Sequence, residues 1–266
     1  MKNYWTLSRD NIFVAAHRGW CGKYPENTME AFKAAADLNV DQIETDVRIT
    51  KDGELVLIHD ATLDRTTNGT GLVCEHTLAE LKSLDAGSHK GEQFKDCRIP
   101  TFKEFMDFVA TLPDMTIDIE LKEYPTEGRE EISYSVCDRV LKMIDDYGFT
   151  DRCVINTFSG KLHEYVRRKY GSKYRQHVYF PLANNGAVTV DPYSYAYCCC
   201  MFGEGAIMAP KEEFDRMKAL DVSPWAGAGV KDAEGVDMAI RHGAELITCN
   251  NPDIILKLLR ERGKHK

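Results

Sequence analysis

Two short segments of the sequence carry a charged side chain at every second position. Residues 43–49 include Glu44 and Asp46, and residues 117–122 include Glu120. Because residues two apart in a β-strand point to the same face, we expect each segment to form a strand with one charged face. Hard divalent cations prefer carboxylate oxygens, so these three residues are predicted to converge on Mg²⁺ or Ca²⁺, with Mn²⁺ as a third candidate.

A different structure would give the same alternation without a site. A half-exposed antiparallel strand also alternates, with its polar face in water. The helical segments that separate the strands argue against this alternative, because antiparallel hairpins do not need them. In a parallel barrel the helices cover the outer face, so the charged face must look inward. Barrel enzymes carry their catalytic groups there, at the carboxyl ends of the strands.

Two histidines and two basic residues also lie at or beside the ends of predicted strands. His17 and His59 each follow a run of apolar, β-branched residues directly, and Arg18 and Lys122 lie beside the predicted strand ends. A single histidine at a strand end is more often structural, but two of them beside a cation site could each transfer a proton. A metal and basic side chains stabilise an anion rich in oxygen, which favours phosphate ester chemistry over acyl transfer.

The segments that must position these residues alternate along the chain between strand-like and helix-like patterns. Runs typical of strands occupy residues 12–16, 42–49, 55–58, 115–121, 153–157, 176–180, 206–209, 222–225 and 245–248. Apolar residues recur at helical spacing in residues 28–38, 102–111, 130–147, 160–170, 211–220, 232–242 and 252–262, several of them after polar starts such as Asn27, Thr101, Ser159 and Asn251. This order predicts a parallel sheet, either open and doubly wound or closed. Eight such units in 266 residues favour an α/β fold of the TIM (β/α)8 barrel type.

Residues 60–113 interrupt this alternation with a series of polar turn signals, among them Thr66-Thr67-Asn68-Gly69. We interpret the stretch as a small insertion after the strand that bears His59. It holds too few apolar residues to fold alone, so residues 1–266 are expected to form a single domain.

Composition limits the classes of partner. Lys and Arg number 34 against 42 Asp and Glu, and the net charge of −8 opposes binding to the phosphate backbone of nucleic acids. No apolar run reaches the ~18 residues of a membrane span, and residues 1–11 lack the apolar stretch of a signal peptide. We therefore expect a cytoplasmic protein that acts on a small molecule. The oligomeric state is left open.

Nine cysteines are present, three of them consecutive at Cys198, Cys199 and Cys200. None forms the Cys-x-x-Cys pair typical of zinc or redox sites, so the thiols are expected to be buried or idle.

An ordered series of motifs resembles the glycerophosphodiester phosphodiesterase family. The series is His17-Arg18-Gly19, Pro25-Glu26-Asn27-Thr28, Glu44-Thr45-Asp46-Val47, Lys51-Asp52-Gly53, His59-Asp60, Leu63-Asp64-Arg65-Thr66-Thr67-Asn68-Gly69-Thr70-Gly71, Ile99-Pro100-Thr101 and Ile119-Glu120-Leu121-Lys122. It covers about residues 13–122 closely and the rest loosely.

This resemblance implies a TIM barrel with a small insertion, in agreement with the break described above. It also implies that His17 and His59 are the catalytic acid and base. Glu44, Asp46 and Glu120 would then hold a Ca²⁺ or Mg²⁺ ion, while Arg18 and Lys122 contact the phosphate. Members of the family cleave glycerophosphodiesters such as glycerophosphocholine or glycerophosphoethanolamine to glycerol 3-phosphate and the free alcohol.

The second half of the chain departs from the family pattern at two places. The family usually has Trp-Thr-Val-Asn near the seventh strand, where this chain has Trp225-Ala226-Gly227-Ala228, and Thr-Asp-x-Pro near the eighth, where residues 248–252 lack the acid. Neither change touches the expected metal ligands or histidines, but the substrate pocket is expected to differ. Trp225 is a candidate substrate-binding residue that could equally fill the top of the barrel.

Other residues rank lower as site candidates. Tyrosines between Tyr193 and Tyr197 could line the mouth, although buried packing is the stronger expectation. The remaining histidines are predicted to be surface or capping residues: His76, His89, His163, His177, His242 and His265. Residues 264–266 are expected to be a solvated tail.

The sequence therefore predicts metal-dependent hydrolysis of a glycerophosphodiester by two-histidine acid/base catalysis. Water or the substrate's own 2-hydroxyl could be the nucleophile, and the pattern does not assign acid and base between the histidines. One alternative keeps the barrel but takes a lysophospholipid or sphingolipid, which would need an apolar groove near residues 193–202. Another is a barrel that binds metal and phosphate without turnover.

Overall fold

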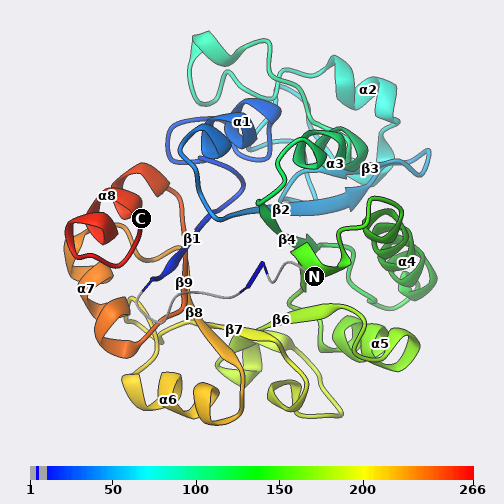
Figure 1. The fold of residues 1–266 in the computed structure, drawn as a ribbon. Coiled ribbons are helices and arrows are strands. Elements are labelled where there is room, and N and C mark those ends of the chain that lie inside the picture. The colour runs from blue at the N-terminus through cyan, green and yellow to red at the C-terminus, as the bar shows by residue number, and fades with distance from the viewer. Residues whose placement is uncertain (1–3, 6–10) are drawn as a thin grey trace.

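The protein forms a closed parallel barrel surrounded by helices, as predicted (Figure 1). A computed structural model describes residues 4–5 and 11–266. Within them the sheet order is β1-β9-β8-β7-β6-β5-β4-β2, and pairing of β1 with β2 closes the ring. The barrel strands are β1 Phe13–Ala16, β2 Gln42–Ile49, β4 Thr116–Leu121, β5 Cys153–Asn156, β6 Arg175–Phe180, β7 Cys198–Met201, β8 Ser223–Ala226 and β9 Leu246–Cys249.

The helices cover the outer face of this ring (Figure 1). They are α1 Met29–Asp37, α3 Phe102–Ala110, α4 Glu130–Asp146, α5 Gly160–Tyr170, α6 Lys211–Ala219, α7 Ala233–His242 and α8 Pro252–Glu261. A further helix, α2 Leu78–Ser83, lies apart from the ring and packs in a separate, small apolar cluster. Outward strand residues such as Ile43 and Ile117 join buried helix residues such as Phe32 and Phe105 in one large apolar core. Because this core occupies one face of each strand, the alternate residues point into the barrel.

The helix starts differ from expectation in one informative case. Thr101 and Ser159 cap α3 and α5 with their side chains, as the polar starts predicted. Helix α1 is capped by Thr28, and the residue before it, Asn27, adopts a left-handed backbone with φ of 54°. Because Thr28 caps the helix, the Asn27 side chain can form hydrogen bonds inside the barrel.

His59 follows a strand that does not belong to the parallel barrel. Strand β3 (Leu55–Leu57) pairs antiparallel with the end of β2, with Val47 opposite Leu57. After β3 the chain builds a second, smaller apolar cluster that includes Leu63 and Leu81, whereas α3 packs on the main core. The division into one domain with an insertion at about residues 60–113 stays a prediction.

The predicted strand at residues 206–209 is wrong. The sixth barrel strand is instead β7, which contains the three consecutive cysteines, and residues 206–209 form bends and irregular structure. Cysteine behaves as a small apolar side chain that is often fully buried, so a run of cysteines is compatible with a strand covered on both faces. The nine cysteines are free thiols and seven are buried, which confirms that expectation.

The two ends of the chain and the helices were the subject of further expectations, namely a missing signal peptide, a solvated C-terminal tail and no membrane span. The opening residues that we interpreted as lacking a signal peptide fall mostly outside the described residues. His265, in the expected solvated tail, bonds Asp41 with its Nε2 2.9 Å from Oδ2, so the tail is partly anchored. Among the described helices, none has both the length and the apolar character needed to cross a membrane.

Candidate active site

The predicted carboxylates come from two neighbouring strands in matching register. In the β2–β4 pair Glu44 lies opposite Asp118, and Asp46 lies opposite Glu120. All four side chains occupy the inward face and all four residues are at most 6% exposed. Ligand oxygens of Glu44, Asp46 and Glu120 lie within 4.8 Å of one another. The structure thus brings together the three residues that the sequence nominated as metal ligands.

The electrostatics of these residues fit a bound divalent cation. Burial and the neighbouring acids raise the pKa of Glu44 well above its usual range, and burial raises the pKa of Glu120 to about 7. Burial would also raise the pKa of Asp46, but Lys122 and Arg18 outweigh it and lower the pKa to about 2. Asp46 Oδ1 accepts no hydrogen bond within the described chain, although it forms an ion pair with Lys122 Nζ at 3.2 Å. Three buried carboxylates this close together are a donor set that suits a hard divalent ion.

Two basic side chains border the carboxylates. Lys122 is 6% exposed, and its Nζ lies 2.5 Å from Glu120 Oε1 and 3.2 Å from Asp46 Oδ1. Arg18 places its Nε 3.3 Å from Asp46 Oδ2, and its backbone N–H donates to Glu44 at 2.8 Å. Both residues line the main pocket of the barrel, where they can meet an anion.

The two histidines lie in the same pocket and differ in their partners. His17 Nδ1 lies 2.7 Å from Asn250 Oδ1, and His59 Nδ1 lies 2.6 Å from Asp60 Oδ1. Burial, reinforced by Arg18, lowers the pKa of His17 to about 4. Burial also lowers the pKa of His59, although Asp46 and Asp60 act against it. Asn250 stands two residues before Pro252, where the motif Thr-Asp-x-Pro would place its acid.

Supporting contacts come from residues that the sequence analysis did not nominate. Asn27 donates through Nδ2 to Asp46 Oδ2 at 2.7 Å and so fixes the orientation of that carboxylate. Arg65, from the segment before β4, binds both oxygens of Glu26 and both oxygens of Asp60. Glu26 pairs with Arg18, and Asp60 pairs with His59. Arg65 therefore links the carboxylate behind Arg18 to the carboxylate behind His59. All of these lie within the quoted motifs, but no spacing rule could reveal which contacts they make.

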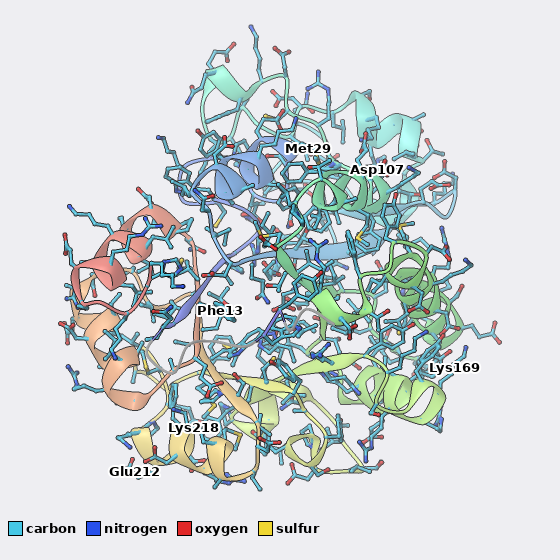
Figure 2. All side chains as sticks on the ribbon, in the orientation of Figure 1. Phe13, Met29, Asp107, Lys169, Glu212 and Lys218 are labelled. Carbon is cyan, nitrogen blue, oxygen red and sulfur yellow. The ribbon has the colours of Figure 1, made fainter. Side chains whose placement is uncertain are left out.

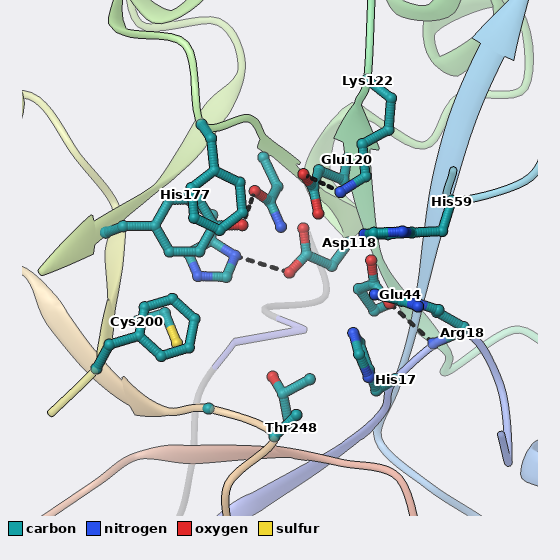
Figure 3. Close-up of a pocket in the computed structure, with 16 residues that line it drawn as sticks. His17, Arg18, Glu44, His59, Asp118, Glu120, Lys122, His177, Cys200 and Thr248 are labelled. Atoms are coloured by element: carbon teal, nitrogen blue, oxygen red, sulfur yellow. Dashed lines mark hydrogen bonds and ion pairs between the residues drawn. The ribbon is translucent and has the colours of Figure 1, made fainter. Parts of the chain in front are cut away.

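The pocket is a cavity of about 270 Å³ with two unlike walls (Figure 3). The wall that carries the catalytic candidates is charged. The opposite wall is built from other strand ends, and its members are Asn156, Phe158, His177, Tyr179, Cys200, Phe202 and Thr248. Rings of Phe158 and Tyr179 stack with centroids 3.8 Å apart, which makes part of this wall aromatic.

Trp225 does not line the pocket. It is 2% exposed and packs with Leu246 and Val154 in an apolar cluster that fills the lower barrel. Its Nε1 donates to Ser223 Oγ at 2.9 Å, and its ring stacks on Trp5 at 6.3 Å. Trp225 therefore neither lines the pocket nor fills the top of the barrel, as the two expected roles required, but fills the barrel below the pocket.

Two histidines predicted for the surface are buried. His163 is fully buried, and both its ring nitrogens have partners, Gln176 Oε1 at 2.8 Å and the Thr157 carbonyl at 3.0 Å. His177 is 3% exposed, points into the barrel and lines the pocket. Both predictions were wrong because a histidine inside a strand or helix carries no sequence signal for the face on which it lies.

The tyrosine-rich segment contributes to the pocket only indirectly. Tyr193 is 3% exposed and donates to the Tyr179 carbonyl at 3.1 Å, which agrees with the expected buried packing. From the predicted apolar region at residues 193–202, Cys200 and Phe202 reach the pocket.

Comparisons with known proteins agree with this geometry. Residues 17–254 match the model of the glycerophosphoryl diester phosphodiesterase family. The chain is 34% identical over 262 residues to a glycerophosphodiester phosphodiesterase of Caldanaerobacter subterraneus subsp. tengcongensis, covering 94% of this chain and 98% of that protein. An Oleispira antarctica phosphodiesterase solved with its product sn-glycerol-3-phosphate is similar in structure, with a TM-score of 0.79, 26% identity and coverage of 93% and 96%. A Silicibacter pomeroyi protein, 21% identical with a TM-score of 0.79 and coverage of 99% and 97%, shows the same fold.

Proposed function

This chain belongs to the glycerophosphoryl diester phosphodiesterase family and is an enzyme of that kind, and from this premise we propose that it hydrolyses a water-soluble glycerophosphodiester. The products would be sn-glycerol 3-phosphate and an alcohol such as choline or ethanolamine. The observation that carries the proposal is that Glu44, Glu120, His17, His59, Arg18 and Lys122 line one pocket, with a ligand oxygen of Asp46 within 4.8 Å of those of the two glutamates.

Glu44, Asp46 and Glu120 would hold the divalent cation, Mg²⁺, Ca²⁺ or Mn²⁺. When bound, the cation would add positive charge beside the phosphate oxygens and so favour attack on phosphorus. Arg18 and Lys122 border the same space and would stabilise the negative charge that builds up on those oxygens.

His17 is proposed as the base. Its Nδ1–H donates to Asn250 Oδ1, which leaves Nε2 of the neutral ring without a proton. Because burial lowers its pKa to about 4, the ring is neutral at pH 7 and can take a proton from the nucleophile. That nucleophile is water or the substrate's 2-hydroxyl, and His17 serves either one.

His59 is proposed as the acid. Its Nδ1 contacts the Asp60 carboxylate, and a carboxylate stabilises the imidazolium form of histidine. Arg65 fixes that carboxylate on its far side. The protonated ring could then give its Nε2 proton to the departing alkoxide.

The size of the pocket supports a compact substrate. Its volume of about 270 Å³ lies just below the ~300–1,000 Å³ of drug-sized ligand sites and suits a headgroup-sized diester better than a long acyl chain. The aromatic wall with Phe158 and Phe202 is the observation that favours a lysophospholipid instead. Activity on micellar lysophospholipid that exceeds activity on glycerophosphocholine would establish that alternative.

The direct test is release of glycerol 3-phosphate from a panel of glycerophosphodiesters, measured with Mg²⁺, Mn²⁺ or Ca²⁺ and again with chelator. We expect turnover that chelator abolishes and that one of the three ions restores. Full activity in excess chelator would remove the cation from the mechanism. The cytoplasmic location stays a prediction.

A further inference from the structure

Asp118 and His177 form a buried pair that the proposed mechanism does not use. Asp118 lies on β4 and is 1% exposed, and His177 lies on β6 and is 3% exposed. His177 Nδ1 is 2.7 Å from Asp118 Oδ2, and both residues line the pocket. Figure 3 shows His177 on the side of the pocket away from His59 and Arg18, with Asp118 between them. The pair therefore spans the pocket, since Asp118 lies on the same strand as Glu120 and His177 lies on the wall away from His59 and Arg18.

Each member of the pair keeps one polar atom open. Asp118 Oδ1 and His177 Nε2 are buried and find no hydrogen-bond partner within the described part of the chain. A buried polar atom without a partner is costly, so native structures retain few of them. The neighbouring Asn156 accepts a hydrogen bond from the Tyr179 hydroxyl and donates none to either open atom.

His163 shows how this chain treats a buried histidine that is only structural. Both ring nitrogens of His163 have a partner, one a side chain and one a carbonyl. His163 lies outside the pocket, whereas His177 lines it and keeps Nε2 open. The contrast indicates that the open atoms of the Asp118–His177 pair await a ligand.

The chemistry of the open atoms defines the group that they would bind. A carboxylate only accepts hydrogen bonds, so His177 must donate through Nδ1–H to Asp118. Asp118 Oδ1 is an open acceptor, so its ligand must bring a hydrogen-bond donor. A hydroxyl group both donates and accepts, so it also suits His177 Nε2 in either protonation state. Choline esterified to phosphate has no such group, whereas the glycerol half of every glycerophosphodiester has two hydroxyls.

We propose that Asp118 and His177 bind the terminal hydroxyl of the glycerol half of the substrate and so select glycerol-containing diesters. This inference rests on the proposed function. The binding residues are separate from the three carboxylates within 4.8 Å of one another, since that group does not include Asp118.

Choline release from two substrates tests the proposal. The first is glycerophosphocholine. The second is (2-hydroxypropyl)phosphocholine, which lacks the terminal hydroxyl but keeps the 2-hydroxyl that could act as nucleophile. The variants are Asp118→Asn, which keeps the shape, and His177→Asn, which keeps a donor near Nδ1 and removes Nε2. His163→Asn is the matched control at a buried histidine outside the pocket.

The wild type should prefer glycerophosphocholine by about 10- to 100-fold in kcat/KM, the value of one buried hydrogen bond. That preference should fall to within about threefold in both pocket variants and stay intact in His163→Asn. Calorimetric titration with glycerol 3-phosphate, which needs no turnover, should show a weakening of similar size. Titration with Mg²⁺ alone should give the wild-type affinity in Asp118→Asn.

Several results would overturn the inference. An unchanged preference in both variants, or an equal loss on the two substrates, would reduce the pair to a structural role. Weaker Mg²⁺ binding in Asp118→Asn with the substrate preference intact would make Asp118 a fourth metal ligand. Loss of a preference for glycerophosphoethanolamine over glycerophosphocholine, in place of the hydroxyl effect, would assign the pair to the leaving group. A wild type that releases neither product but binds glycerol 3-phosphate through the pair would refute the proposed function alone.

Discussion

Competition between protons and the divalent cation should be measurable at Glu120. Burial raises the pKa of this carboxyl from 4.5 to about 7 in the metal-free protein, and a cation binds only the ionised form. For one group with a pKa of about 7, the apparent affinity should fall about 10-fold at pH 6 and about 100-fold at pH 5 relative to pH 9. The raised pKa of Glu44 adds to this slope.

The same shift predicts how the metal-free fold responds to pH. A carboxyl whose folded pKa exceeds its unfolded value favours folding when protonated, so this contribution is full below pH 4.5 and is lost as the pH rises to about 7. Glu120 alone should lower the free energy of unfolding by about 3 kcal/mol between pH 4.5 and pH 8. Saturating cation should remove most of this loss, because it stabilises the ionised carboxylates.

Isothermal titration calorimetry in two buffers of different ionisation enthalpy measures both affinity and protons released. The control is Glu120→Gln, which binds the cation more weakly and should release about one proton fewer than the wild type at pH 6. Urea unfolding of the metal-free protein at pH 5 and pH 8 checks the stability effect. A cation affinity that is constant from pH 6 to pH 8, with no proton release, would refute the reasoning.

Three further predictions concern single side chains. His17→Ala and His59→Ala should each lower kcat by about 10²–10⁴-fold with cation affinity unchanged in calorimetry, and near wild-type turnover in both would remove the mechanism. Arg65→Met should lower kcat roughly 10-fold at an unchanged unfolding temperature, because it releases the carboxylates behind Arg18 and His59; wild-type kcat would contradict that positioning role. Trp225→Phe should leave KM within about twofold but lower the free energy of unfolding by about 1–3 kcal/mol in urea, and a large rise in KM would return Trp225 to the pocket.

The cluster of three carboxylates was predictable because its signal is local to each strand. Alternate charges in β2 and β4 leave few arrangements once helices separate the strands, and the observed register places Asp46 opposite Glu120. Two neighbouring parallel strands that both turn a charged face inward must bring those charges together. The closed barrel followed from the same alternation of strands and helices along the chain.

The supporting residues were not predictable in the same way. Asp118 and His177 lie 59 positions apart, and their contact depends on the stagger of β4 and β6 around the barrel. Arg65 is half-exposed and comes from the segment that breaks the β/α rhythm, yet it binds Glu26 and Asp60, which pair with Arg18 and His59 of the pocket. A pattern within one strand does not contain such relations.

The level of each inward-facing residue along the barrel axis also cannot be read from the sequence. On β8 and β9 the inward residues Trp225 and Leu246 belong to the apolar floor. Two positions further along, Gly227 and Thr248 line the pocket. All four residues share the inward face, so only the level of each strand separates packing from a ligand contact.

The departure at Gly227 is matched to its neighbours in the pocket wall. A Cβ atom at this position would lie 2.7 Å from the Phe202 ring and 3.0 Å from Cys200 Sγ, so the valine of the family motif would fit only if these side chains shifted. Phe202 lies 5.5 Å from the ring of Tyr179 and nearly parallel to it, so it extends the aromatic wall toward Gly227. The small residue at position 227 and the present position of the Phe202 ring therefore depend on each other, and a substitution at one of them changes the shape of this wall.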